Sequence, residues 1–137
     1  MVMFCLLNKG QAKELISLGL VSEQVKIADK LINVEIADTQ EKRVDGLKWR
    51  NSMPQNSGML FIYDNDRLGG FWMRDTLIDL DIAFIDKKGF IVGVDTMKSQ
   101  SSKIYKPEIA YRYVLELNAG FFKQHKIGVG EKVTGWK

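Results

Sequence analysis

The segment FWMRDTLIDLDIAFIDKKGFIVGV, residues 71–94, decides the fold because its apolar residues recur at every second position. Such alternation is typical of β-strands, whose successive side chains point to opposite faces of a sheet. The residues Asp86-Lys87-Lys88-Gly89 predict a hairpin turn with glycine in the left-handed position. We expect one face to carry Ile78, Leu80, Ile82 and Phe84, and the other Asp79, Asp81 and Ala83.

The segments on either side of this hairpin show the same period. Residues 25–36 alternate around a turn at residues 28–30, which predicts a second hairpin. The run MLFIY, residues 59–63, is typical of a buried strand, and we expect Asp64-Asn65-Asp66 to end it. Residues 112–117 alternate again, and we expect a last strand to end at Trp136.

Helices are few and short in this sequence. Residues 39–43 predict a helix that Asp38 or Thr39 caps and Gly46 ends. Residues 121–127 predict one or two helical turns, and residues 11–18 a short helix that stops at Gly19. Short strands, little helix and glycine-rich turns predict a mainly β fold, a small closed or partly closed β-barrel with one or two short peripheral helices.

The length and composition fit a single domain. We expect residues 25–137 to form one barrel-like domain, with residues 1–24 a separate N-terminal segment that contributes a short strand and helix. The net charge of +3 comes without a clustered Lys/Arg stripe, which argues against nucleic-acid binding. No apolar run reaches the roughly 20 residues of a membrane span. The apolar start has no basic region and no cleavage site, so we expect an unexported, cytoplasmic protein.

Single copies of cysteine and histidine limit the chemistry. Cys5 is the one cysteine of the sequence, so an intramolecular disulfide is excluded. Cys5 and His125, the one histidine, are too few ligands for a zinc site of the usual type. The one type of metal site that the composition still allows is Mg²⁺ or Ca²⁺ bound by carboxylates. We predict neither a metal nor a cofactor. A Ser-His-Asp or Cys-His constellation and a phosphate-binding glycine loop are both disfavoured.

The first candidate site lies in the opening segment. In an extended strand Trp72, Arg74 and Thr76 share one side, so the indole and the guanidinium can stack as a cation–π pair worth about 0.5–2 kcal/mol. Gly69 and Gly70 allow a close backbone approach. The structural alternative is that Arg74 pairs with a carboxylate at the sheet rim, with Trp72 packed beneath it.

Acidic residues on strands are the second group of candidates. Asp79 and Asp81, about 6.5–7 Å apart on one face, are compatible with a hard cation or with acid–base catalysis, but also with a solvated outer face. A buried network with Arg43, Arg50 or Arg74 is a further alternative. Glu116 lies in an apolar strand and should have a partner, for which Arg50 or Arg74 is suited.

Four blocks of sequence, ADTQEKRVDGLKWR, GMLFIY, FWMRDTLIDLDIAFID and YVLELNAG, carry a resemblance to a known family. Together they resemble the bacterial and archaeal family called domain of unknown function 192, from about Val25 to Lys137. The resemblance implies a compact, mostly β, barrel-like domain with a short helix, and it implies no activity. The matching polar positions are Thr39, Arg43, Arg50, Trp72, Thr76, Asp81, Glu116 and Asn118.

Two positions depart from the family pattern. Lys48 stands where the pattern has Met, and Arg74-Asp75 stands for Lys-Asn, which keeps the cation but turns an amide into an acid. The resemblance also implies that many relatives carry export signals or lipoprotein anchors. This sequence shows neither, so an extracytoplasmic location is not transferred to it.

Three functional hypotheses follow. The leading one is a non-enzymatic module that binds a small polar ligand, a sugar or a carboxylate, through aromatic and guanidinium groups. The second is a glycoside or polysaccharide hydrolase with Asp81 and Glu116 as its carboxylate pair. The third is a structural or protein-partner domain. The ligand-binding hypothesis assigns the site to Arg43, Arg50, Trp72, Arg74, Thr76, Asp81, Glu116 and Asn118.

Overall fold

A computed structural model of the chain describes residues 8–11, 14 and 23–136. The expected helix at 11–18 and the apolar start at 1–7 therefore lie wholly or largely outside the described residues. Within the described part the strands form one seven-stranded sheet, in the order β5-β4-β6-β3-β2-β1-β7. Its strands are β1 (Glu23–Ile27), β2 (Lys30–Ala37), β3 (Ser57–Arg67), β4 (Leu80–Ile85), β5 (Ile91–Met97), β6 (Tyr111–Asn118) and β7 (Val133–Thr134).

Both predicted hairpins are confirmed. Strands β1 and β2 pair antiparallel around Ala28, whose φ of 55° makes the tight turn. Strands β4 and β5 pair around residues 86–90, where Asp86 accepts hydrogen bonds from the backbone N–H groups of Lys88 and Phe90, both at 2.9 Å. Gly89 has a φ of 96°, which L side chains rarely adopt.

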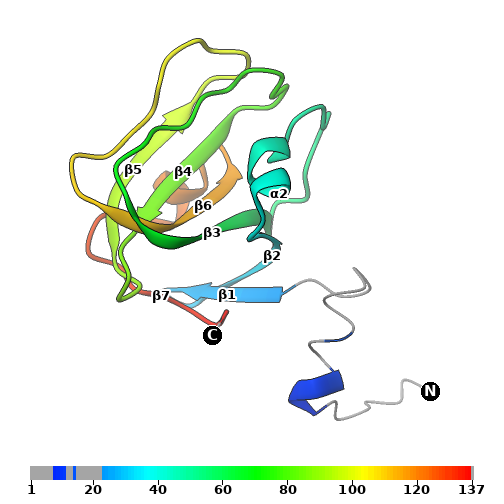
Figure 1. Cartoon of the computed structure of the whole chain (residues 1–137), viewed down its shortest axis with the longest axis vertical. Helices are drawn as coiled ribbons and strands as arrows, with labels where there is room; N and C mark the ends of the chain where they lie inside the picture. Colours follow the sequence, from blue (N-terminus) through cyan, green and yellow to red (C-terminus); the bar gives the residue numbers. More distant parts are fainter. Residues whose placement is uncertain (1–7, 12–13, 15–22, 137) are drawn as a thin grey trace.

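The sheet curls until its two ends meet, as Figure 1 shows for β5 and β7. An antiparallel bridge joins Phe90 to Lys132. Beside it the N–H of Ile91 donates to the carbonyl of Glu131 at 2.9 Å, and that of Val133 to the carbonyl of Gly89 at 2.8 Å. The fold is thus a half-barrel closed at one end, which confirms the prediction of a mainly β, partly closed barrel.

Within residues 23–136, two helices accompany the sheet. In α2 (Gln40–Asp45) the hydroxyl of Thr39 accepts the N–H of Lys42 at 3.1 Å, and Gly46 ends the helix at a φ of 50°. None of its residues is buried, so α2 is peripheral, as predicted. In contrast, α3 (Phe121–His125) buries Phe121 and Phe122 against the sheet.

Apolar side chains cover both faces of the sheet. We call the cluster that contains Leu115, Leu117 and the two α3 phenylalanines the first core. The cluster on the opposite face, which contains Leu47, Met59, Met73, Ile82 and Val114, is the second core. Because β4 contributes to both, all six of its residues are buried.

Three boundaries differ from the sequence prediction. Strand β3 does not end at 64–66 but continues to Arg67 through a bulge, where Arg112 of β6 binds Asp66 at 2.9 Å. Only Phe71 of the segment before β4 pairs like a strand, with Tyr105, and a turn follows it. The last strand stops at Thr134, and the Trp136 ring packs on Tyr113 with centroids 5.0 Å apart.

Candidate functional site

The arginines of the expected cluster do not share one site. Arg43 donates to the carbonyl of Ile62 at 2.8 Å and lies over the Tyr63 ring, 5.0 Å from its centroid. Arg50 forms a two-hydrogen-bond ion pair with Glu35 of β2. Both guanidinium groups are therefore engaged within the fold.

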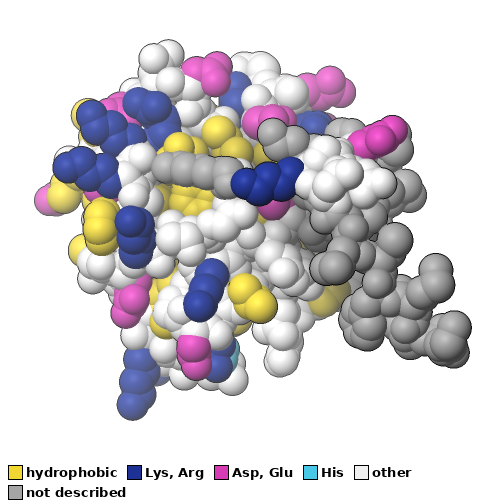
Figure 2. All heavy atoms as spheres, turned by 90° about the horizontal axis from the view of Figure 1, so that it is seen from below, with side chains coloured by type: hydrophobic (Ala, Val, Ile, Leu, Met, Phe, Trp, Pro, Cys, Tyr) yellow, Lys and Arg dark blue, Asp and Glu magenta, His cyan; other side chains and the backbone are white. Residues whose placement is uncertain are grey.

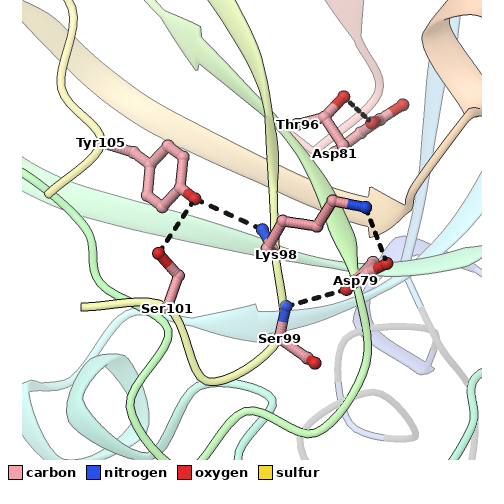
Figure 3. A network of polar contacts seen from close by, with 7 residues as sticks. All are labelled: Asp79, Asp81, Thr96, Lys98, Ser99, Ser101 and Tyr105. Carbon is pink, nitrogen blue, oxygen red and sulfur yellow. Dashed lines mark hydrogen bonds and ion pairs between the residues drawn. The ribbon is translucent and has the colours of Figure 1, made fainter. Parts of the chain in front are cut away.

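Asp81 is a structural group beneath α3. Its Oδ1 accepts the hydroxyl of Thr96 at 2.8 Å, and its Oδ2 accepts the N–H of Phe122 at 3.0 Å. Only 2% of the residue is exposed, so the solvated-face interpretation is wrong for Asp81 because α3 covers this face. Figure 3 shows the pair of Asp81 and Thr96 apart from the neighbouring polar contacts of Asp79.

Asp79 anchors the loop that follows β5 (Figure 3). Its carboxylate accepts the N–H of Ser99 at 2.8 Å and lies 3.7 Å from the ammonium of Lys98. In the same loop the hydroxyl of Tyr105 accepts the N–H of Lys98 at 3.3 Å. Nowhere in residues 8–11, 14 and 23–136 do three His, Cys, Asp or Glu side chains gather as a metal site would require.

Glu116 is buried on the opposite face of the sheet from Asp81. Its cross-strand neighbours are Met59 and Ile82 of the second core, and 5% of the residue is exposed. Its carboxyl group has no hydrogen bond or ion pair with the described residues, so the predicted pairing with Arg50 or Arg74 is wrong. Burial raises the pKa of Glu116 to about 8.

The register also separates the two carboxylates of the hydrolase hypothesis. Asp81 pairs with Leu117, whereas Glu116 pairs with Ile82, so the two acids point to opposite faces of the sheet. A glycosidase needs both carboxyl groups on one cleft, about 5–9.5 Å apart and flanking the scissile bond. The arrangement does not provide this geometry.

Two further expected residues hold loops in place. The carboxamide nitrogen of Asn118 donates to the carbonyls of Met53 at 2.8 Å and Pro54 at 3.2 Å, which ties the loop after α2 to β6. Thr76 is buried, and its N–H donates to the carbonyl of Met73 at 3.1 Å within the turn before β4. Asn118 therefore positions the loop before β3, whereas Thr76 lies in the turn that carries Arg74, to whose carbonyl its hydroxyl donates at 3.4 Å.

Trp72 and Arg74 do come together at the surface. The guanidinium carbon of Arg74 lies 5.7 Å from the centre of the Trp72 ring, which confirms the predicted cation–π grouping. Trp72 is 52% exposed. Arg74 makes no ion pair within the described part of the chain, and this contradicts the rim-capping alternative.

The prediction missed Trp49, which belongs to the same region. Trp49 is 65% exposed, and its backbone N–H donates to the backbone carbonyl of Asp75 at 2.9 Å. The N–H of Asp75 in turn donates to the carboxamide oxygen of Gln100 at 3.1 Å, and the N–H of Gln100 to the carbonyl of Thr76 at 3.0 Å. The signal in the sequence was an aromatic residue between two cations, Lys48-Trp49-Arg50.

Left-handed backbone concentrates in this region. Trp49, Asp75 and Gln100 have φ values of 65°, 59° and 60°, although none is glycine. Such conformations cost of order 1–3 kcal/mol each and gather at binding or catalytic sites. We call the surface formed by Trp49, Trp72, Arg74, Asp75 and Gln100 the tryptophan corner.

The side chains of the tryptophan corner are of the kinds that bind ligands. It offers two aromatic faces and one guanidinium fork, which can hold a carboxylate with two parallel hydrogen bonds. It has no hydroxyl or thiol nucleophile beside a histidine base.

The charges on the surface are mixed. Figure 2 shows Lys and Arg side chains interspersed with Asp and Glu on one face of the molecule. No helix of the described residues is long and apolar enough to cross a membrane.

Comparison with known proteins identifies relatives of this chain, and their descriptions name no activity. The model of the domain of unknown function 192, described as "Uncharacterized ACR", matches residues 23–135. A UPF0127 protein of Pyrococcus abyssi is 32% identical over 121 residues, which cover 85% of this chain and 97% of that protein.

Two solved structures share the fold. One, a candidate transcription regulator of Sinorhizobium meliloti, has a TM-score of 0.80 and 31% identity, over 84% of this chain and 94% of that chain. The other, a protein of unknown function from Novosphingobium aromaticivorans, has a TM-score of 0.78 and 25% identity, over 81% and 83% of the two chains.

Proposed function

The chain belongs to the domain of unknown function 192 family, and from that premise we propose that it is a non-enzymatic module that binds a small carboxylate-bearing ligand at the tryptophan corner. The observation that carries the proposal is the exposure of two tryptophans, 65% for Trp49 and 52% for Trp72, on loops held by one hydrogen-bond network. Large aromatic side chains so exposed and so fixed are typical of ligand contacts.

Buried neighbours make the two indoles rigid platforms. Leu47 lies two residues before Trp49, and Met73 directly follows Trp72. Both are at most 2% exposed and pack in the second core. The loops are thus anchored from within while their indoles face solvent, and a preorganised site loses less entropy on binding.

The charge of the corner favours a carboxylate over a neutral sugar. Arg43 and Arg50 are engaged within the fold, whereas the guanidinium group of Arg74 contacts only the Trp72 ring among the described residues. Its fork of donors is therefore available to an anion, and the Trp72 face is available to the ligand's carbon skeleton.

Tryptophan fluorescence tests the proposal directly. A panel of aliphatic and aromatic carboxylates, with the matching neutral amides, is titrated into the protein and into R74A, R74K and W72F. The W136F variant keeps both corner indoles and removes the signal of Trp136, which packs on Tyr113 outside the corner. We expect saturable quenching by carboxylates, at least tenfold weaker binding in R74A and partial recovery in R74K. Equal affinity in R74A, or no response to any carboxylate, would overturn it.

A protein partner is the second candidate, favoured by the position of Ile104. The antiparallel Phe71–Tyr105 bridge brings Ile104 beside Gly70, two residues before Trp72, and Ile104 is 53% exposed. Exposed apolar side chains such as Trp72 and Ile104, close in the chain to the cation of Arg74, are also typical of a surface that binds another protein. Sedimentation of the protein and of I104S over a range of concentrations discriminates, since only the partner hypothesis expects association that depends on Ile104.

The similar structure from Sinorhizobium meliloti is described as a candidate transcription regulator, but we do not propose that this chain binds DNA. The net charge of this chain is only +3, and acids lie between its cations on the face in Figure 2. Proteins that bind DNA concentrate Lys and Arg in a stripe or patch that neutralises phosphates.

A further inference from the structure

The structure has a hollow that shares no residue with the tryptophan corner. It is bounded by the loop before β3, by the end of β6 and by α3, and its volume is about 160 Å³. Its lining residues are Gln55, Asn56, Asn118, Ala119, Phe121, Gln124 and His125.

The chemistry of this hollow is that of neutral polar groups. Four of its lining residues are Asn or Gln and one is His, with no Lys, Arg, Asp or Glu among them. A carboxamide offers two donors and one acceptor, so such a lining can match a ligand that both donates and accepts hydrogen bonds. Since the lining has no Lys, Arg, Asp or Glu, it has none of the side chains that usually compensate a charged ligand.

Several of these polar groups are unused by the fold. The side chains of Gln55, Asn56 and Gln124 form no hydrogen bond within the described residues, and the carboxamide oxygen of Asn118 accepts none there. The Asn118 nitrogen is engaged with the carbonyls of Met53 and Pro54, which fixes the direction of its oxygen.

Both walls of the hollow are held in place from behind. The carbonyl of Asn56 accepts the N–H of Asn33 of β2 at 2.8 Å, which fixes the loop wall. The helix wall is fixed by Asp81, which accepts the N–H of Phe122 at 3.0 Å. The site would therefore need little reorganisation when it binds.

An aromatic floor completes the hollow. Phe121 is 6% exposed and packs in the first core, and its ring centroid lies 4.4 Å from that of His125. An aromatic surface beside hydrogen-bonding groups suits a ring that has one apolar face and several hydroxyl groups. A cavity of about 150 Å³ accommodates a benzene molecule, so the volume here fits a single six-membered ring.

We propose that this hollow, which we call the carboxamide pocket, binds one neutral sugar ring through Gln55, Asn56, Asn118 and Gln124. The proposal is independent of the tryptophan corner. It assigns the neutral ligand to the carboxamide pocket and leaves the carboxylate to Arg74.

Nuclear magnetic resonance titration tests the pocket with methyl glycosides of glucose, galactose, mannose and N-acetylglucosamine, each at millimolar concentration. The side-chain amide signals and the backbone signals of residues 119–125 report binding. We expect saturable shifts for at least one glycoside, with affinity at least tenfold weaker in the Q55A/Q124A double variant. Both replaced residues are exposed, so the fold should be retained, and a thermal melt of the variant verifies this.

Two controls separate the proposal from other outcomes. K123A changes an exposed α3 residue outside the lining and should bind the glycoside like the parent protein. R74A should also leave the glycoside affinity unchanged, so failure of the corner and failure of the pocket are distinguishable. No shift with any glycoside, or equal affinity in the double variant, would overturn the assignment.

Discussion

At the scale of single residues, Glu116 makes the stability of the domain depend on pH. Its carboxyl group lies in the second core without a hydrogen bond from the described residues, and burial raises its pKa from the ordinary 4.5 to about 8. The folded chain therefore holds a proton that the unfolded chain releases. Stability contributed in this way is complete below pH 4.5 and is lost as the pH rises to about 8.

The variant E116Q should remove this dependence because its carboxamide stays neutral. The free energy of unfolding of the parent protein should fall from pH 5 to pH 8, while that of E116Q should stay flatter. Since one pKa unit corresponds to about 1.4 kcal/mol, we expect E116Q to be the more stable by a few kcal/mol at pH 8. Urea denaturation at half-unit pH steps measures both curves.

Glu108 is the matched control, because it is exposed. E108Q should follow the parent curve at every pH. Identical slopes for E116Q and the parent protein would show that the Glu116 carboxyl is ionised in the folded state and has a partner or water that compensates it.

Residue contacts were predictable from the sequence only where they are local. Trp72 and Arg74 are two positions apart, and their contact was expected even though the backbone there turns instead of continuing as a strand. The partner of Arg50 was not predictable, because Glu35 reaches it through the parallel pairing of β2 with β3. Trp49 was missed because its role depends on a backbone hydrogen bond to Asp75.

At the scale of elements, the attachment of α3 depends on one carboxylate. Asp81 of β4 accepts both the first-turn N–H of Phe122 and the hydroxyl of Thr96 on β5, so it links a helix and two strands. The helix has only five residues and no side-chain cap at Gly120. A helix so short is not stable by itself and depends on such tertiary contacts.

The variant D81A should loosen α3 and destabilise the domain. It leaves a buried N–H and a hydroxyl without an acceptor, each of which costs about 1–3 kcal/mol. Denaturation should show a loss of roughly 2–5 kcal/mol, and amide exchange should accelerate across residues 121–125. D81N, which keeps one acceptor oxygen, should fall between D81A and the parent protein. Unchanged exchange at Phe122 in D81A would contradict this role.

Period-two patterns predicted the elements well wherever the pattern controls burial. Residues 80–84 alternate between the two faces of the sheet as expected, and both hairpins turn where glycine or a short polar run stands. The pattern failed at 64–66, where the polar residues remain in β3 because Arg112 pairs with Asp66 across the strands. It also failed at 71–76, because an alternating sequence does not reveal that Asp75 takes a left-handed backbone.

At the scale of the whole molecule, two cores on opposite faces of one sheet separate two surfaces. Leu47 and Met73 of the second core anchor the loops that expose the tryptophan corner. Phe121 of the first core forms the floor of the carboxamide pocket. The same layering explains why Asp81 and Glu116 never meet, since β4 and β6 contribute alternate side chains to the two sides.

Closure of the half-barrel is the feature that holds the first core together at one end. Ile91 and Val133 come from the two ends of the strand order, and both lie in the first core. The backbone contacts of Gly89 and Val133 bring them together. A Cβ at Gly89 would lie 2.9 Å from the carbonyl oxygen of Val133, so a substitution there should open the closure.

Gly130 provides a control of nearly identical backbone conformation. Its φ is 98°, against 96° for Gly89, but a Cβ at Gly130 would meet nothing within 4 Å. Alanine at either position has the same left-handed strain, about 1–2 kcal/mol. Only alanine at Gly89 adds crowding against Val133, which should cost a further 1–3 kcal/mol or so.

We therefore expect G89A to lose more stability than G130A in urea denaturation. Amide exchange of Ile91 and Val133 should accelerate in G89A and stay near the parent rate in G130A, because the closing hydrogen bonds open only in the first. If both variants lose the same stability and protect Val133 equally, the meeting of β5 and β7 contributes little, and the first core is held by the continuous strands alone.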